Sequence, residues 1–151
     1  MSVDELDTLF NKRSGMMGLT GFGDLREVHR LVEEGNEDAK LALDIYVHRI
    51  VGYIGNYTAQ MGGVDVITFT AGVGENDDVV RKMVCDKLAP FGVKLDEEKN
   101  ATRSKEPRII STPDSAVTIC VIPTNEELAI ARKSAAIAEE GKDSYGNVFS
   151  K

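Results

Sequence analysis

The stretch VDVITFTAGVGENDDVVRKMVCDKLAP, residues 64–90, decides the fold class of this chain. Its first part, residues 64–71, is β-branched and almost continuously apolar or Thr, which predicts a strand buried on both faces at the centre of a sheet. The glycine turn GVGEN follows at residues 72–76, and an apolar stripe at helical spacing predicts a helix over residues 77–90. This order of strand, glycine turn and helix is typical of a mixed α/β domain.

Three helices are expected before this strand, over residues 3–11, 24–34 and 36–62. Asp24 opens the second of them as a carboxylate that can cap the first free N–H groups. The third is apolar around more than one face, so we expect it to be covered on more than one side. Residues 14–23 contain four glycines and are expected to form a shaped loop.

After the expected helix 77–90, we expect a short strand and a polar turn over residues 91–100, and strands over residues 108–110 and 116–122. The segment PTNEE then opens a further helix, which Thr124 or Asn125 can cap. Residues 140–151 are polar and contain glycine, so we expect a loose tail after a domain that spans residues 1–139.

The composition is that of one globular domain, with 151 residues, 42% hydrophobic and 28% charged. The formal net charge is −7, and an acidic chain without a basic run is a poor partner for nucleic acid or an anionic membrane surface. No apolar run approaches the ~20 residues of a membrane span, and the first ten residues lack the features of a signal peptide. Cys85 and Cys120 lie far apart among apolar residues, which favours two buried thiols in a reducing cytoplasm, and the lack of a CxxC or HxxxH pair excludes a Cys-rich zinc site.

The turn TAGVGEN is the first segment that could bind a ligand. Gly72 and Gly74 lack Cβ atoms, so a phosphate or a flat base could lie against the backbone there. A purely structural turn explains the same residues equally well. The sequence has no GxxxxGK[ST] motif, which excludes a P-loop, and Asp77 stands where a dinucleotide-binding GxGxxG motif has its third glycine.

Two further segments could complete a site. Asp24 and Arg26 follow the glycine-rich residues and could bind a sugar hydroxyl and a phosphate, or form a helix cap beside a solvated arginine. Glu126 opens a helix directly after a strand, where a carboxylate could hold Mg²⁺ or simply favour the helix N-terminus. His29 and His48 lie on expected helices away from any nucleophile, so packing or surface roles are favoured over catalysis.

Taken together, these segments resemble a known family. SGMMGLTG and GDLREV, EEGNEDAKLALDIYVHRIVGYIGNYTAQMGGVD, ITFTAGVGEN and VIPTNEELAIAR, in this order, are similar to the C-terminal part of acetate kinases over roughly residues 3–135. The resemblance implies a ribonuclease-H-like α/β domain of the acetate and sugar kinase, heat-shock ATPase and actin superfamily. It also implies a homodimer formed largely through this domain.

The resemblance assigns roles to three groups of residues. The family segment that touches the adenosine and the α-phosphate corresponds to Gly72, Val73, Gly74, Glu75 and Asn76. The triplet beside the nucleoside corresponds to Asp24, Leu25 and Arg26, and the loop before it is one residue shorter here than in the family. The family glutamate that binds Mg²⁺ near the phosphates corresponds to Glu126.

Other family motifs do not occur in this sequence. The family begins with an Asn-x-Gly-Ser-Ser-Ser turn and holds acetate and the transferring phosphoryl group with an Arg, an Asp and two His residues from upstream segments. We therefore expect a fragment, or the product of a truncated gene, that contains no catalytic residue and forms no acetyl phosphate by itself. The implied reaction is ATP + acetate ⇌ ADP + acetyl phosphate with Mg²⁺.

Three alternatives stay open from the sequence: a propionate or butyrate kinase of the same family, a nucleotide-binding module without catalysis, and a structural dimerisation half. Two expectations follow for experiments. The wide apolar stripe of residues 36–62 predicts a dimer at micromolar concentration. A side chain at Gly74 is expected to block the ligand with little change in melting temperature, provided that the φ angle of this glycine is negative.

Overall fold

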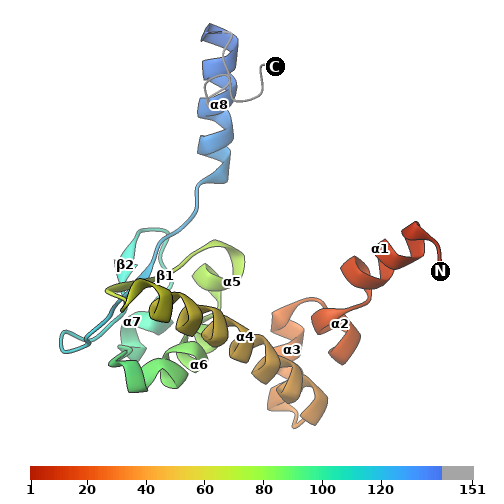
Figure 1. Ribbon diagram of the computed structural model, residues 1–151, viewed down its shortest axis with the longest axis horizontal. Coiled ribbons are helices and arrows are strands. Elements are labelled where there is room, and N and C mark those ends of the chain that lie inside the picture. Colours follow the sequence, from red (N-terminus) through yellow and green to blue (C-terminus); the bar gives the residue numbers. More distant parts are fainter. Residues whose placement is uncertain (141–151) are drawn as a thin grey trace.

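A computed structural model describes residues 1–140 of the chain. These residues form a body of helices packed against a small sheet, with one helical arm at each end (Figure 1). The sheet has three strands in the order β1-β3-β2. They are β1 (Val66–Phe69), β2 (Arg108–Ile109) and β3 (Thr118–Val121). The mixed α/β class expected from the sequence is therefore confirmed, while the expected tail lies outside the described residues except for the helical Glu140.

The central strand of the sheet is β3, not the strand expected from the sequence. Strand β1 runs parallel to β3 with Val66 opposite Thr118, and β2 pairs antiparallel on the other side of β3. Strand β1 is thus an edge strand among the described residues, and the prediction of a central strand buried on both faces was wrong. Only one face of β1 is covered, because Ile67 is buried while Val66 is 53% exposed.

The main helices begin within one residue of the positions expected from the sequence, each directly after a capping side chain. Helix α3 (Leu25–Glu33), helix α4 (Glu37–Met61) and helix α6 (Asp78–Leu88) follow Asp24, Asn36 and Asp77, and each of these side chains accepts a hydrogen bond from a backbone N–H in the first turn. Helix α1 (Val3–Lys12) starts with a reciprocal capping box between Ser2 and Glu5. At the end of α4, Gly62 adopts a left-handed conformation with φ of 74°.

Three segments expected to be loops, turns or strands contain short helices instead. They are α2 (Gly15–Thr20), α5 (Ala71–Asn76) and α7 (Glu97–Ala101). Glycine density alone predicted a loop over residues 14–23, but the glycines with positive φ stand at the first position of α2 and just after its end, where they do not interrupt it. A single 3₁₀ turn (Ala89–Phe91) follows α6, and the expected strand near residue 95 is reduced to one bridge between Leu95 and Ser111.

The hydrophobic core lies between α4, α6 and one face of the sheet. Fully buried side chains come from each of these layers: Val47, Val84, Leu88, Ile110, Ile119 and Val121. Cys85 belongs to this core, and its burial raises the pKa of the thiol to about 12. Cys120 is only half-buried, so the expectation of two buried thiols holds for one of them.

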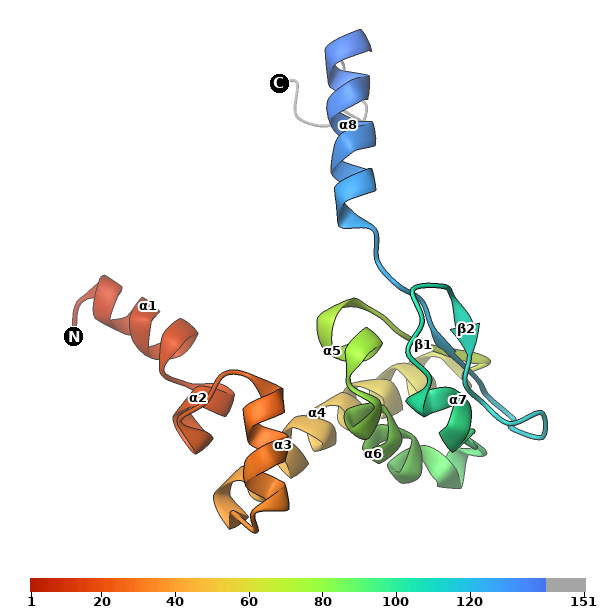
Figure 2. The same cartoon turned by 180° about the vertical axis from the view of Figure 1, so that it is seen from behind.

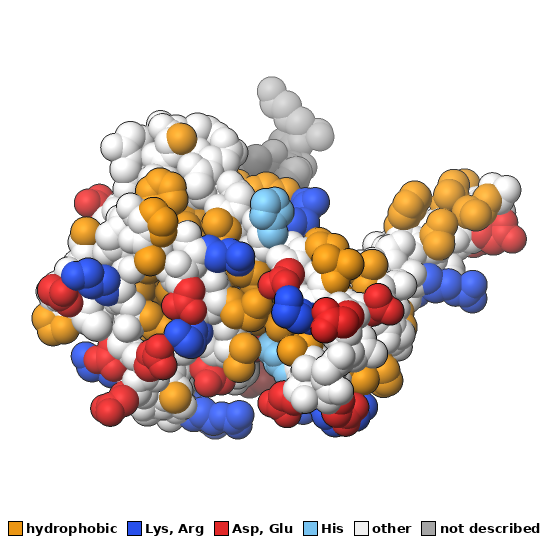
Figure 3. Space-filling model, turned by 90° about the horizontal axis from the view of Figure 1, so that it is seen from below, with side chains coloured by type: hydrophobic (Ala, Val, Ile, Leu, Met, Phe, Trp, Pro, Cys, Tyr) orange, Lys and Arg blue, Asp and Glu red, His pale blue; other side chains and the backbone are white. Residues whose placement is uncertain are grey.

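The two arms are α1 and α8 (Glu126–Glu140), which project from the body in different directions (Figures 1 and 2). Both expose apolar side chains: Leu6, Leu9 and Phe10 on α1, and Leu128, Ile130 and Ile137 on α8. Viewed from below, hydrophobic side chains gather on one arm, while acidic and basic side chains intermingle over the body (Figure 3). No helix among residues 1–140 is both long and apolar enough to cross a membrane.

Candidate nucleotide site

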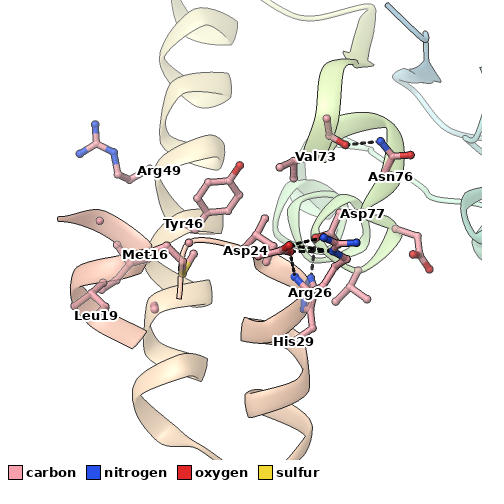
Figure 4. A pocket seen from close by; sticks show the side chains of 18 of the residues that line it. Met16, Leu19, Asp24, Arg26, His29, Tyr46, Arg49, Val73, Asn76 and Asp77 are labelled. Atoms are coloured by element: carbon pink, nitrogen blue, oxygen red, sulfur yellow. Dashed lines mark hydrogen bonds and ion pairs between the residues drawn. The ribbon is translucent and has the colours of Figure 1, made fainter. Parts of the chain in front are cut away.

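A groove of about 1260 Å³ lies between the α2–α3–α4 layer and the α5–α6 segment (Figure 4). It brings together six of the residues that the sequence placed near a nucleotide, namely Asp24, Leu25, Arg26, Gly72, Val73 and Asn76. Gly74, Glu75 and Glu126 are not among the residues that line it. Apolar side chains from three helices, Met16, Leu19, Ile45, Tyr46 and Val79, form much of the remaining wall.

On the α3 side, Asp24 serves as both helix cap and ion-pair partner. Its Oδ1 atom accepts a hydrogen bond from the Arg26 backbone N–H at 2.9 Å, and the Arg26 guanidinium donates to both carboxylate oxygens. These hydrogen bonds lower the pKa of Asp24 to about 2, so the carboxylate is ionised at neutral pH. The Arg26 side chain is 89% exposed and lies at the mouth of the groove.

On the α5 side, the backbone is exposed to the groove at Gly72. A Cβ atom built at this residue would meet no other atom within 4 Å, so the space beside the backbone is open. The Asn76 side chain donates to the Gly72 carbonyl at 2.8 Å and thereby closes the short helix. Ala71 precedes them with φ of 57°, a left-handed conformation that few residues other than glycine adopt.

Gly74 faces the sheet instead of the groove. A Cβ atom at Gly74 would lie 3.1 Å from the carbonyl carbon of Phe69 and 3.4 Å from its Cα atom. A side chain there would press against the end of β1 and disturb the segment itself. The expectation that a substitution at Gly74 blocks the ligand without affecting stability was therefore wrong, and Gly72 is the position that tests the groove.

The α5 segment rests on a buried arginine that the sequence analysis missed. Arg81 is only 2% exposed, and its Nη1 atom donates to the carbonyls of Gly74 and Glu75 at 2.9 and 3.0 Å. Its Nε and Nη2 atoms donate to the side chain and the carbonyl of Asn100, both at 2.7 Å. Burial lowers the pKa of the guanidinium, which stays within the charged range of arginine. The available signal was its spacing, since Arg81 precedes Val84 by three residues on the buried face of α6.

Glu75 connects the α5 segment to the start of the C-terminal arm. Its carboxylate accepts hydrogen bonds from the Thr124 backbone N–H at 2.7 Å and from the Thr124 hydroxyl at 3.0 Å. Asn125 caps α8, which decides between the two cap candidates, because its side chain accepts from the Leu128 N–H. Glu126 follows as the first residue of α8, within about 7 Å of Thr124 along the backbone.

The described residues offer no complete metal cage. Within residues 1–140, no group of three His, Cys, Asp or Glu side chains is arranged to hold an ion. Mg²⁺ bound with a nucleotide commonly takes only one or two protein carboxylates and fills its other positions with phosphate oxygens and water. The exposed Glu126 carboxylate fits such a role as a single ligand, while it could not hold a metal by itself.

A hydrogen-bonded pair of a histidine and an aspartate also lines the groove, and the sequence did not reveal it. The His29 Nε2 atom lies 2.7 Å from the Asp77 Oδ2 atom, and the two side chains are 20% and 13% exposed. The residues come from α3 and from the cap of α6, 48 positions apart, so no local pattern could pair them. His48 is exposed on α4 and does not line the groove, as expected for a surface residue.

Comparisons with known proteins agree on one family. The Acetokinase family model matches residues 1–132. The acetate kinase of Leifsonia xyli is 54% identical over 134 residues, which are 89% of this chain and 34% of the relative. The crystal structure of Porphyromonas gingivalis acetate kinase superposes with a TM-score of 0.80 at 41% identity, over 92% of this chain and 35% of the other. A propionate kinase from Francisella tularensis gives a TM-score of 0.77 at 39% identity, over 87% of this chain and 33% of the other.

The chain thus spans about a third of the length of the relatives that it matches. The matched residues include α3, β1, α5 and the first part of α8, so they contain every segment of the candidate site. The chain belongs to the acetokinase family.

Proposed function

We propose that residues 1–139 are the nucleotide-binding C-terminal domain of an acetate kinase, which catalyses ATP + acetate ⇌ ADP + acetyl phosphate with Mg²⁺. The observation that carries this proposal is the groove itself. Asp24–Arg26 and Gly72–Asn76 are far apart in the sequence, yet residues of both segments line one cavity, which is large enough for a nucleotide. Family membership supplies the chemistry, and the named relatives supply acetate as the acceptor.

The groove has the surfaces that a nucleoside phosphate needs. Its apolar wall, which includes Met16, Leu19 and Tyr46, can cover a base, and the Gly72 backbone leaves room for a close approach. The ionised Asp24 carboxylate can accept hydrogen bonds from ribose hydroxyl groups. Two further arginines that line the groove, Arg49 and Arg103, form no ion pair with a carboxylate within residues 1–140 and can attract phosphates.

Glu126 is our candidate for the metal contact. The hydrogen bonds between Glu75 and Thr124 hold the residues just before Glu126 beside the α5 segment. A carboxylate there can ligate Mg²⁺ directly or through water while the phosphate oxygens fill other positions. The bound ion would supply charge neutralisation to the phosphates, and the role of Glu126 is to place it.

Phosphoryl transfer requires in-line positioning and cationic stabilisation more than covalent chemistry from the protein. In our proposal this chain positions the nucleotide and contributes one metal contact. The sequence lacks the family segments that hold acetate and stabilise the transferring phosphoryl group. We therefore expect the 151 residues assayed alone to form no acetyl phosphate, and turnover that survives removal of host kinases would contradict this.

The acceptor could also be a longer carboxylate. The structural similarity to a propionate kinase favours propionate as the second candidate, with butyrate as a further member of the same chemical class. Two alternatives are not enzymes. One is a module that binds nucleotide without catalysis, and the other is a structural dimerisation half whose groove binds no ligand. Steady-state assays with each acid, on the protein that contains the whole family sequence, separate the acceptors.

We further propose that the protein is a homodimer in the cytoplasm. Helix α4 leaves apolar and aromatic side chains exposed outside the groove, namely Leu41, Tyr53, Tyr57 and Met61. Tyr53 and Tyr57 stack with ring centroids 6.5 Å apart, which forms a continuous aromatic surface. Light scattering at micromolar concentration should give twice the chain mass, and a monomer at ~1 mM, the weak end of the affinity scale, would reject the dimer.

The test of the nucleotide site is a titration of ADP with Mg²⁺ by calorimetry. Gly72→Val fills the open space beside the groove, so it should weaken binding by tenfold or more, which is at least ~1.4 kcal/mol. Gly52→Val is the matched control, because a Cβ atom there also meets nothing within 4 Å and the residue does not line the groove. Equal affinities for the parent, Gly72→Val and Gly52→Val would show that the nucleotide does not bind in the groove. If the parent does not bind ADP at millimolar concentration, the alternative of a structural dimerisation half is favoured.

A further inference from the structure

We propose that His29 is a positioning residue, which holds the Asp24–Arg26 segment and the Gly72–Asn76 segment at the separation that the nucleotide requires. The inference rests on the proposed function, because it concerns the same groove. His29 acts on the Gly72–Asn76 segment through Asp77 and is not itself a reacting group.

His29 and Asp77, which form a hydrogen bond, are each held in place by further contacts. His29 follows Val28, which is completely buried and fixes α3 against α4. The Asp77 Oδ1 atom accepts from the Val80 N–H at 2.9 Å, so one carboxylate oxygen caps α6. The other oxygen, Oδ2, faces the His29 Nε2 atom at 2.7 Å. The carboxylate therefore bridges α3 and α6 with one oxygen for each.

The same aspartate also fixes the end of α5. The Asp77 backbone N–H donates to the Val73 carbonyl at 2.9 Å, inside the segment that is expected to contact the nucleotide. A shift of Asp77 would therefore move Val73 and its neighbours. Within residues 1–140, no second hydrogen bond joins α3 to α5 or α6. The imidazole of His29 thus supplies the hydrogen-bonded link across the groove, in addition to the apolar packing of α3 and α6 on α4.

Three variants separate this role from simple packing. His29→Ala removes the donor, whereas His29→Gln keeps an N–H donor on a side chain of similar reach. Asp77→Ser keeps one side-chain oxygen, which can accept the hydrogen bond from the Val80 N–H and cap α6. It lacks the second oxygen that His29 contacts. His48→Ala is the matched control, since His48 is exposed on α4 and does not line the groove.

The experiment measures ADP affinity with Mg²⁺ and the backbone amide spectrum of each variant without ligand. His29→Ala and Asp77→Ser should each weaken ADP binding by at least about fivefold, the low end of coupling between linked sites. The double variant should be no weaker than either single one, His29→Gln should recover most of the affinity, and His48→Ala should equal the parent. In the free proteins, His29→Ala should shift the amide signals of residues 72–76.

The outcomes distinguish this inference from the proposed function. If the parent binds ADP and His29→Ala binds it equally well, the positioning role is wrong and the nucleotide site stands. Additive losses in the double variant, or no recovery with His29→Gln, would reduce His29 to a packing residue. If the parent fails to bind ADP, the proposed function is wrong, and His29 has no role in ligand binding. Unshifted amide signals of residues 72–76 in His29→Ala would show that the His29–Asp77 contact does not position this segment.

Discussion

The carboxylate of Glu75 accepts two hydrogen bonds from Thr124, one from the backbone N–H at 2.7 Å and one from the hydroxyl at 3.0 Å. These residues lie 49 positions apart, in α5 and just before α8. Their contact ties the glycine segment beside the groove to the residue that opens the C-terminal arm. The geometry of any metal held at Glu126 depends on this tether, because only Asn125 stands between Thr124 and Glu126.

Removal of the tether should loosen the start of the arm. Glu75→Ala is expected to accelerate hydrogen exchange of the Thr124 amide, whereas Glu75→Gln keeps a carbonyl acceptor and should retain part of the protection. Glu106→Ala, an exposed glutamate in a loop, is the control. Equal protection of Thr124 in Glu75→Ala and in the parent would show that the tether does not hold the arm.

Acid should have the same effect as the substitution. The Thr124 amide donates to Glu75 and holds the pKa of that carboxyl below its ordinary value of 4.5. A lowered carboxyl pKa means that the contact contributes fully above pH 4.5 and is lost as the pH falls through the lowered value. Exchange at Thr124, corrected for its intrinsic pH dependence, should therefore rise only below that range, and a rise between pH 7 and 5 would contradict the assignment.

The left-handed conformation of Ala71 predicts a stabilising substitution. Its φ of 57° costs a non-glycine residue roughly 1 kcal/mol, so Ala71→Gly should raise the free energy of unfolding by about that amount. Ala59→Gly, at an exposed position with ordinary helical geometry in α4, should lower it by about 1 kcal/mol. Denaturant unfolding measures the free energy of unfolding of both variants. A lower value for Ala71→Gly than for the parent would show that the backbone at Ala71 is not strained.

The buried arginine predicts a large loss of stability. Arg81→Leu leaves the carbonyls of Gly74, Glu75 and Asn100 without their donor, and it should lower the free energy of unfolding by about 3 kcal/mol or more. Arg81→Lys should recover little, because an ammonium cannot reproduce the planar fork of four hydrogen bonds. Arg13→Leu, on the exposed end of α1, should stay within about 0.5 kcal/mol of the parent. A stable Arg81→Leu variant would mean that the α5 segment has another support.

Local patterns predicted the elements whose boundaries are set by their own residues. Asp24, Asn36 and Asp77 each cap the helix that the sequence placed after them, and Gly62 ends α4 as expected. These signals succeed because a cap joins a side chain to N–H groups only two or three residues away. The family resemblance, confirmed over residues 1–132, supplied an expectation that such patterns cannot give, namely that three distant segments contribute to one site. The groove brings residues of two of these segments together.

The features that could not be predicted depend on contacts across the fold. The apolar sequence of β1 resembles an interior strand, but its neighbours in the described chain cover one face only. The orientation of Gly74 depends on Phe69 and on Arg81, which the glycine pattern does not contain. The pairing of His29 with Asp77 crosses 48 residues. No periodicity or spacing rule reaches over such distances.

Two-dimensional ¹H–¹⁵N NMR of the 16.5 kDa chain can show whether Asp24–Arg26 and Gly72–Asn76 bind one nucleotide together. ADP with Mg²⁺ is titrated while the backbone amide signals of both segments are followed. We predict that both groups of signals shift with the same dissociation constant and that Gly62, which ends α4 and does not line the groove, does not shift. Shifts confined to one segment, different dissociation constants for the two, or no shift at millimolar ADP would contradict the account.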